Sequence, residues 1–252
     1  MSRLNILSID FDYFQIVDEH TMVNHYPDGH DFNSELSSMI WSTHYAWESS
    51  EKELMKVKLD KTKIGKVKTI LKFGRDDCMV NMIANSHVHI NQLLEMLKDR
   101  ADGFNIYNLD MHHDMFDTEI ENGEIVCKGK LSCGNWASYA KKNLNSKIIW
   151  IKNHLSDTLF PSDLPDEQTL DISILDGVKF DAVFLCRSDI WLPPHLDTHF
   201  NRLKDYMRNE LYESTYMDPQ VDKPRDIVEQ AREMRKVYKT MHADFNKGVA
   251  NG

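Results

Sequence analysis

Five short runs of apolar and β-branched residues recur along the first three quarters of the chain, and they constrain its fold more than any other feature. Most of them are apolar almost throughout, which is typical of strands covered on both faces. Segments with helical periodicity separate them. We therefore expect an α/β fold of the three-layer αβα type, with a mostly parallel sheet between two layers of helices. The runs cover residues 4–9, 79–84, 104–109, 147–151 and 180–185.

Three helical segments are indicated by the spacing of their apolar residues. Residues 90–97 form an amphipathic pattern, and the Lys-rich segment 51–73 predicts one or two helices with a break near Gly65. The tail 224–245 carries an apolar stripe and has Pro224 near its first turn, which indicates a C-terminal helix.

A chain of 252 residues suits one large α/β domain, 1–252, better than two small ones. Within that domain, segment 18–75 is expected to form a lid or a wall of the substrate site, because histidines and aromatic residues gather in its first part. The C-terminal helix either covers the core or joins two copies into a homo-oligomer.

Side chains of metal-binding types follow three of the expected strands. In an extended segment every second side chain points to the same face, so an Asp-x-Asp or Asp-x-His-x-Asp set is expected to project together. The carboxyl ends of parallel strands meet at one edge of a sheet, where ligands usually bind. Six residues are therefore expected to converge: Asp10 and Asp12, His87, and Asp110, His112 and Asp114.

Four carboxylates at one sheet edge repel one another, and several would be protonated unless cations lay among them. Two divalent cations balance the charge of four aspartates and leave the imidazole nitrogens to complete the coordination. Carboxylate-rich sites with a few imidazoles favour manganese, whereas structural zinc sites favour thiolates. The sequence therefore predicts a dinuclear metal hydrolase site with two Mn²⁺ ions per subunit.

Two other histidines lie close to these residues. His89 competes with His87 as the ligand of the second segment, and His87 is favoured because it follows a strand and begins a helix. His113 has the opposite phase from His112, so we expect it to be a buried packing residue.

An apolar run followed by Asp-x-Asp also opens the phosphatases of the haloacid-dehalogenase type. There the first Asp is a nucleophile and the second is an acid/base. That interpretation usually requires Thr or Val two residues further on, where this chain has Phe14. It also gives the set that begins at Asp110 no role.

Taken together, the His after a strand, the Asp-x-His-x-Asp set and the Asp-x-Asp set resemble the arginase/agmatinase ureohydrolase superfamily. Three further stretches are similar to a divergent branch that includes the peptide arginases of ribosomal-peptide biosynthesis. They are SIDFDYF at 8–14, LSCGNW at 131–136 and CRSDIWLPPHL at 186–196. In the superfamily the Asp-x-Asp strand comes after the Asp-x-His-x-Asp strand, whereas here it comes first. A circular shuffle of strand order would preserve the site in space.

The resemblance implies an arginase/deacetylase-like fold, a dimanganese site built from the six residues, and hydrolysis of a guanidinium group to urea and an amine. The motif matches favour an arginine-containing precursor peptide as the substrate, with peptidyl arginine becoming peptidyl ornithine. Asp114 would also accept a proton from the attacking water and pass it to the leaving amine. Ser132 and Asn135 are expected to contact the substrate, and Asp189 is expected to hold the guanidinium through paired hydrogen bonds.

Composition limits the classes of binding partner that this chain would suit. The formal net charge of −10 argues against nonspecific binding of nucleic acid or acidic membranes, and it suits a cationic substrate. The four cysteines form no CxxC pair and are expected to be buried thiols. No apolar run approaches the ~18 residues that span a bilayer, and no signal-peptide pattern opens the chain, so a cytoplasmic location is expected.

Three other functions remain open. A small-molecule guanidino hydrolase of the arginase or agmatinase type would turn over free arginine and fail on a peptide. A deacetylase-like amide hydrolase on the same fold would normally contain one zinc ion. A non-enzymatic binding protein with a relic site would keep its fold and its partner after Asp110 and His112 are replaced by Ala.

Overall fold

The computed structural model describes residues 2–29, 33–212 and 214–250. In this part of the chain a seven-stranded sheet has the order β11-β4-β10-β1-β5-β8-β9, and every neighbouring pair is parallel. All five predicted strands are present, and two short edge strands are added. The strands are β1 Leu4–Asp10, β4 Val80–Ala84, β5 Phe104–Asp110, β8 Ser146–Lys152, β9 Glu167–Thr169, β10 Ala182–Cys186 and β11 Tyr216–Met217.

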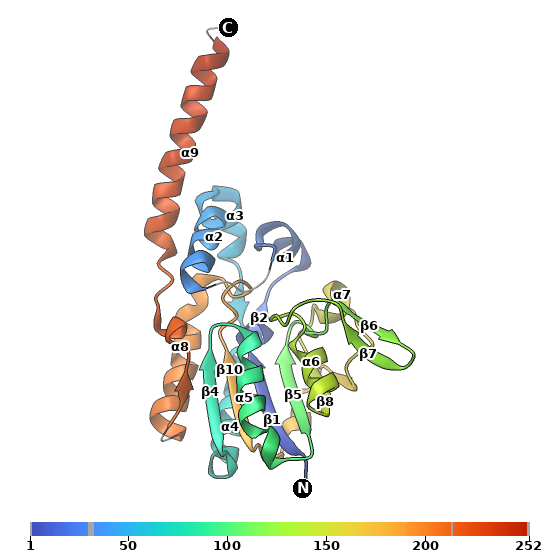
Figure 1. Ribbon diagram of the computed structural model, residues 1–252. Helices are drawn as coiled ribbons and strands as arrows, with labels where there is room; N and C mark the ends of the chain where they lie inside the picture. The colour runs from blue at the N-terminus through green and yellow to red at the C-terminus, as the bar shows by residue number, and fades with distance from the viewer. Residues whose placement is uncertain (1, 30–32, 213, 251–252) are drawn as a thin grey trace.

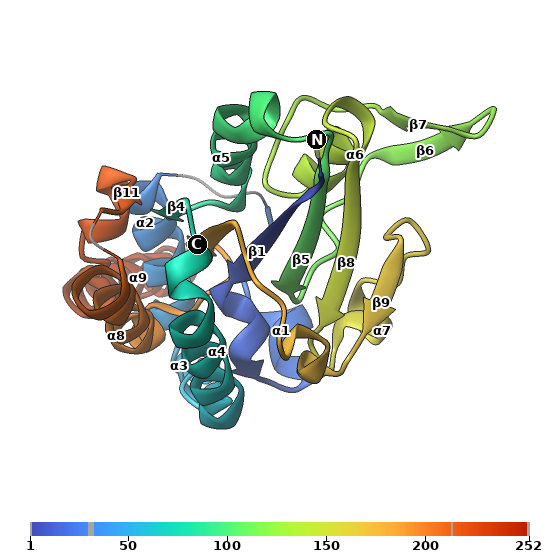
Figure 2. The ribbon, with the colours of Figure 1, turned by 90° about the horizontal axis from the view of Figure 1, so that it is seen from below.

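Helices cover both faces of the sheet, which confirms the predicted three-layer α/β fold (Figures 1 and 2). Alternate residues of β1 enter two separate apolar cores. Ile6 packs in the core that includes α5 (Ile90–Leu97) and α6 (Trp136–Asn143). Ile9 packs in the core that includes α4 (Lys61–Gly74) and α8 (Asp197–Tyr206). Because both faces of β1 are buried, its sequence is apolar almost throughout.

The described part of segment 18–75 folds mainly as helices beside the sheet, but its helix break differs from the prediction. Gly65 lies inside α4, and the break falls before it, at the short strand β3 (Lys58–Leu59). The carboxylate of Asp60 accepts hydrogen bonds from the first backbone N–H groups of α4, so this residue caps the new helix. The remaining elements of the segment are α1 Glu19–His25, α2 Ser34–Ala46 and α3 Glu48–Leu54, while β3 pairs with β2 Gln15–Ile16.

The C-terminal helix α9 (Ile227–Ala250) is present and begins three residues beyond Pro224. Its first turns bury Ile227 and Ala231 in the apolar core, and Tyr238 stacks on Trp47 with ring centroids 4.9 Å apart. The rest of α9 extends well beyond the sheet (Figure 1). The helix therefore covers part of the core at its beginning, as one of the two expectations proposed.

The other elements connect this framework. They are β6 Thr118–Glu121 and β7 Glu124–Cys127, which pair as an antiparallel hairpin, and α7 Ser156–Leu159. Short 3₁₀ or π turns occur at Phe11–Phe14, Arg75–Asp77, His87–His89, Lys98–Arg100, Ile172–Leu175, Pro194–Leu196, Met207–Leu211 and Pro219–Asp222. Across the described ranges, each helix is too short or too polar to cross a membrane.

The central position of β1 leads to a stability prediction. Ile9→Ala removes a fully buried side chain directly before Asp10 and leaves a cavity in the core, so we expect the free energy of unfolding to fall by about 2–5 kcal/mol. Urea unfolding measures this change. Val237→Ala on the exposed side of α9 is the reference, with an expected change within about 0.5 kcal/mol. Equal effects of the two substitutions would contradict the buried position of β1.

Candidate metal centre

The sheet brings all six predicted metal-binding residues to one place. Strand β1 lies between β10 and β5, so the carboxyl ends that carry Asp10 and Asp110 are neighbours. His87 follows β4, on the other side of β10. The six side chains are almost completely buried: Asp10, Asp12, His87, Asp110, His112 and Asp114.

The first group of donor atoms surrounds His87. Its Nδ1 atom lies 3.2 Å from Oδ2 of Asp10, 3.1 Å from Oδ2 of Asp110 and 2.9 Å from Oδ2 of Asp114. This nitrogen has no partner with hydrogen-bond geometry. The other ring nitrogen, Nε2, lies 2.7 Å from the hydroxyl of Ser8. Ser8 therefore fixes the ring so that Nδ1 points at three carboxylates, which is how a metal-binding imidazole is usually oriented.

The second group of donor atoms surrounds His112. Its Nδ1 atom lies 3.0 Å from Oδ2 of Asp12 and 3.6 Å from Oδ1 of Asp110. In each group, three donor atoms lie within 4.8 Å of one another. Asp110 belongs to both groups and offers a different oxygen to each. The arrangement is therefore that of two adjacent cation sites that share one carboxylate.

Hydrogen bonds hold these carboxylates in place. The backbone N–H of His112 donates to Oδ1 of Asp110 at 2.8 Å, and Nδ2 of Asn108 donates to Oδ2 of the same residue at 3.2 Å. The indole N–H of Trp136 donates to Asp114, and the backbone N–H of Met111 donates to Oδ1 of Asp12 at 3.2 Å. The donor set is thus positioned by the protein itself.

Strand alternation alone does not bring these residues together. Strand β5 ends at Asp110, and His112 and Asp114 lie in the loop that follows. Asp114 has a φ of 50°, in the left-handed region that aspartate tolerates better than most residues. Asp12 lies in a 3₁₀ turn rather than in β1. The i, i+2, i+4 spacing predicted the correct residues, but the turns after β5 and β1 direct the side chains of His112, Asp114 and Asp12.

Burial and mutual repulsion shift the pKa values of the aspartates. Burial, then the neighbouring Asp12 and Asp110, raise the pKa of Asp10 to about 7. Burial and Asp110 raise the pKa of Asp114 well above its ordinary value. Burial also opposes the charge of Asp110, but hydrogen bonds with His112 and His87 outweigh it and lower the pKa of Asp110. Without cations, burial and repulsion therefore favour the protonated forms of Asp10 and Asp114.

The buried atoms fit divalent cations. Among the described residues, the ion pairs of the four aspartates involve only His87 and His112, so no lysine or arginine neutralises them. Besides Nδ1 of His87, the buried atoms Oδ2 of Asp12 and Nε2 of His112 lack hydrogen-bond partners. Oxygen and imidazole donors in this mixture suit Mn²⁺ and similar ions.

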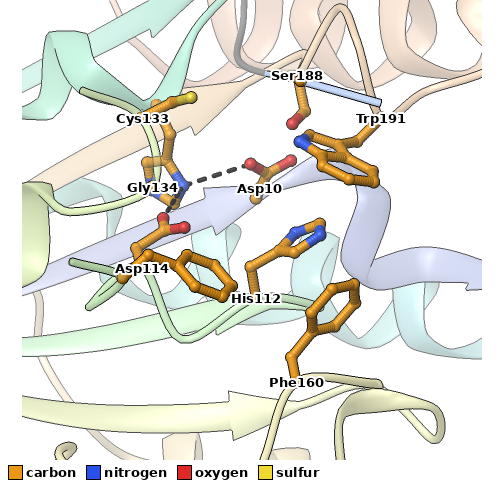
Figure 3. Close-up of a pocket in the computed structure, with 11 residues that line it drawn as sticks. Asp10, His112, Asp114, Cys133, Gly134, Phe160, Ser188 and Trp191 are labelled. Carbon is orange, nitrogen blue, oxygen red and sulfur yellow. Dashed lines mark ion pairs between the residues drawn. The ribbon is translucent and has the colours of Figure 1, made fainter. Parts of the chain in front are cut away.

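A cavity of about 240 Å³ opens onto this cluster, and Figure 3 shows its lining. Asp10, His87, His112 and Asp114 form its polar floor. Its walls are largely aromatic: Phe116, Phe160 and Trp191 line it, and the ring of His112 lies 4.3 Å from that of Phe160 and 4.4 Å from that of Trp191. Gly29, Cys133, Gly134 and Ser188 complete the lining.

The structure does not bring Asp189 to this cavity, which corrects the expectation that it holds a substrate guanidinium. Asp189 is fully buried, and both of its carboxylate oxygens are paired with the guanidinium of Arg187. Ser34 donates a further hydrogen bond to Oδ2 at 2.6 Å. The carboxylate is therefore occupied by the protein's own arginine.

The loop that contains Ser132 and Asn135 lines the cavity, but these two predicted residues are not part of the lining. Oδ1 of Asn135 accepts a hydrogen bond from the backbone N–H of Ser132 at 2.8 Å, and its Nδ2 donates to the carbonyl of Lys130 at 2.9 Å. The amide of Asn135 thus closes its own loop. Cys133 and Gly134 are the members of this loop that line the cavity.

The two other histidines near the predicted ligands, His89 and His113, belong to neither group of donor atoms. His89 pairs with Asp218 at 3.2 Å on the protein surface, away from the cluster. His113 is buried beside the ring of Trp150, and its Nδ1 accepts a hydrogen bond from the backbone N–H of Met115 at 2.9 Å. Burial lowers the pKa of His113 to about 4, so it is neutral at pH 7. Its packing role agrees with the prediction.

Several residues that shape the site were missed. Ser8 and Asn108 are the buried polar residues inside the apolar strands β1 and β5, and this exception to the apolar pattern was a readable signal. Trp136 lies within the stretch LSCGNW and gave no signal of its own. Ser188 and Trp191, which line the cavity, gave no separate signal in the sequence.

Comparisons with protein-family models, with curated proteins and with solved structures find no match for this chain. The geometry of the site is therefore what a functional proposal has to rest on.

The buried pair of Asp189 and Arg187 gives a pH-dependent prediction. Asp189→Asn leaves the charge of Arg187 without its carboxylate partner, so we expect a loss of about 3–5 kcal/mol in the free energy of unfolding at pH 7. Burial opposes the charge of Asp189, but Arg225 and Arg187 outweigh it and lower its pKa. The unfolded chain therefore binds a proton first as the pH falls, so the stabilisation declines below about pH 4 and is lost as the pH passes through the lowered pKa of the folded state.

Urea unfolding between pH 7 and pH 3 measures this effect. The difference between the wild type and Asp189→Asn should shrink toward pH 3. The matched control is Asp163→Asn, which changes an exposed carboxylate and should stay within about 0.5 kcal/mol of the wild type throughout. A difference that stays constant with pH would contradict a charged Asp189 in the folded protein.

Proposed function

We propose that this protein is a dinuclear metal hydrolase that converts arginine side chains of a peptide to ornithine and releases urea. The observation that carries the proposal is the sharing of Asp110 between two buried groups of donor atoms, one around His87 and one around His112. Asp10 and Asp114 would complete the first cation site, and Asp12 would complete the second. Two Mn²⁺ ions suit this set of oxygen and nitrogen donors.

When bound, the two ions supply a water of lowered pKa and polarise the group that it attacks. The protein supplies the remaining functions. Asp114 lies at the cavity floor beside the first cation site, so its carboxylate is placed to accept a proton from the water and pass it to the leaving amine. The indole of Trp136 keeps this carboxylate in position through its hydrogen bond.

The shape and charge of the cavity favour a side chain over a free amino acid. At about 240 Å³ it is narrow, and its aromatic walls can pack against the methylene groups and the flat guanidinium of arginine. Among the described lining residues there is no lysine or arginine to bind the carboxylate of free arginine. The net charge of −10 also favours a basic peptide.

The rival functions account for less of the site. A one-zinc amide hydrolase needs only one group of ligands, and a haloacid-dehalogenase-type phosphatase gives His87 and His112 no role. A small-molecule guanidino hydrolase would be expected to hold the charged ends of its substrate. We also propose a cytoplasmic location, in keeping with four cysteines that form no disulfide.

The direct test is incubation with Mn²⁺ and arginine-containing peptides, followed by mass spectrometry. Each converted arginine loses CN₂H₂ as urea forms with water, so the peptide mass should fall by about 42 Da per residue. Free arginine is the parallel substrate and should release little urea. Unchanged peptides in the presence of verified bound metal would overturn the proposal, and turnover of free arginine alone would favour the small-molecule alternative.

The metal content of single variants tests the ligand assignment separately from activity. His87→Ala should reduce bound Mn²⁺ from about two ions per chain to about one, and Asp110→Ala should remove most of both because its oxygens serve both groups. Elemental analysis after dialysis measures the content. His89→Ala is the matched control, since His89 lies outside the cluster, and it should retain both ions. Loss of metal in this control would show that the assignment is wrong.

A further inference from the structure

Ser188 combines three unusual properties. It lines the cavity above the candidate metal centre, it is only 2% exposed, and its φ is 58°. A non-glycine residue in the left-handed region is strained and persists there only where its surroundings hold it, and such residues concentrate at functional sites. Figure 3 places the Ser188 side chain at the same side of the cavity as Trp191, with its hydroxyl directed toward Asp10.

The strained position of Ser188 is fixed by its two neighbours in the chain. Arg187 and Asp189 form a two-point ion pair with each other, one bond of which joins Nη2 to Oδ2 at 3.0 Å. Trp41 and Arg225 hold the same turn from outside, since Nε1 of Trp41 and Nη1 of Arg225 donate to the carbonyl of Asp189 at 2.9 and 2.5 Å. The charged side chains are thereby kept out of the cavity lining, and the serine is kept in it.

This division of roles bears on substrate binding. The carboxylate of Asp189 is occupied, while Asp10, Asp114 and the two histidines at the cavity floor are the expected metal ligands. Among the described residues of the lining, Ser188 provides the one hydroxyl. A hydroxyl oxygen can accept a hydrogen bond from a guanidinium N–H without adding a charge that would compete for the metals.

We propose that Ser188 is a substrate-binding residue whose Oγ atom accepts a hydrogen bond from a terminal N–H group of the arginine guanidinium. Arg187 and Asp189 act as positioning residues that hold Ser188 toward the cavity. This inference rests on the proposed hydrolysis of peptidyl arginine and names the residue that recognises the reacting group.

Two variants separate the hydroxyl from the backbone. Ser188→Ala removes the hydroxyl and keeps the strain, whereas Ser188→Gly removes the hydroxyl and relieves the strain, because glycine adopts positive φ readily. Both should keep about two Mn²⁺ ions per chain, and the glycine variant should unfold at the same urea concentration as the wild type or a higher one. Both should lose about 10- to 100-fold in kcat/KM on an arginine peptide, as expected for a lost hydrogen bond to a charged group.

The ornithine-containing product peptide supplies a readout that is independent of turnover. It lacks the terminal guanidinium nitrogens, so its inhibition constant should stay within about twofold of the wild-type value in both variants. Wild-type kcat/KM in Ser188→Gly would overturn the inference. A parallel weakening of the product would also overturn it, because Ser188 would then act only through the shape of the cavity. An inactive, metal-loaded wild type would instead overturn the proposed function itself.

Discussion

The repulsion between four buried carboxylates is the constraint on which the rest of the site depends. Asp10, Asp12, Asp110 and Asp114 are held together by a rigid parallel sheet and by hydrogen bonds from surrounding residues. Such a cluster is costly in the absence of positive charge, and among the described residues two imidazoles are the only ion-pair partners that offset it. The fold therefore maintains a buried excess of negative charge that divalent cations can neutralise. The cavity opens onto this charge.

The sequence predicted the strands correctly where both of their faces are buried. The strands around Ile6, Ile83 and Phe184 are buried on both faces, so a near-continuous apolar run predicted them directly. The edge strands β9 and β11 are short and partly exposed, so their sequences carry no comparable pattern. The helix break was misplaced at Gly65 because a glycine inside an otherwise favourable helix can be tolerated, while Asp60 supplied a stronger start signal.

The sequence predicted the types of ligand in the site and the strands that they follow, but not the roles of the residues around them. All six expected ligands meet, and the early position of Asp10 and Asp12 in the chain does not prevent this, because β1 inserts between β10 and β5. The role of Asp189 could not be derived from sequence. Its partner Arg187 is two residues away, and only the backbone turn at Ser188 brings the two side chains together.

The strand order has a consequence for synthesis of the chain. All six expected ligands have been made once residue 114 is added. However, β4, which precedes His87, reaches β1 only through β10, and β10 ends at Cys186. The group around His112 follows β1 and β5, which pair directly, whereas the group around His87 requires β10 between β4 and β1, and this strand is made after all six ligands.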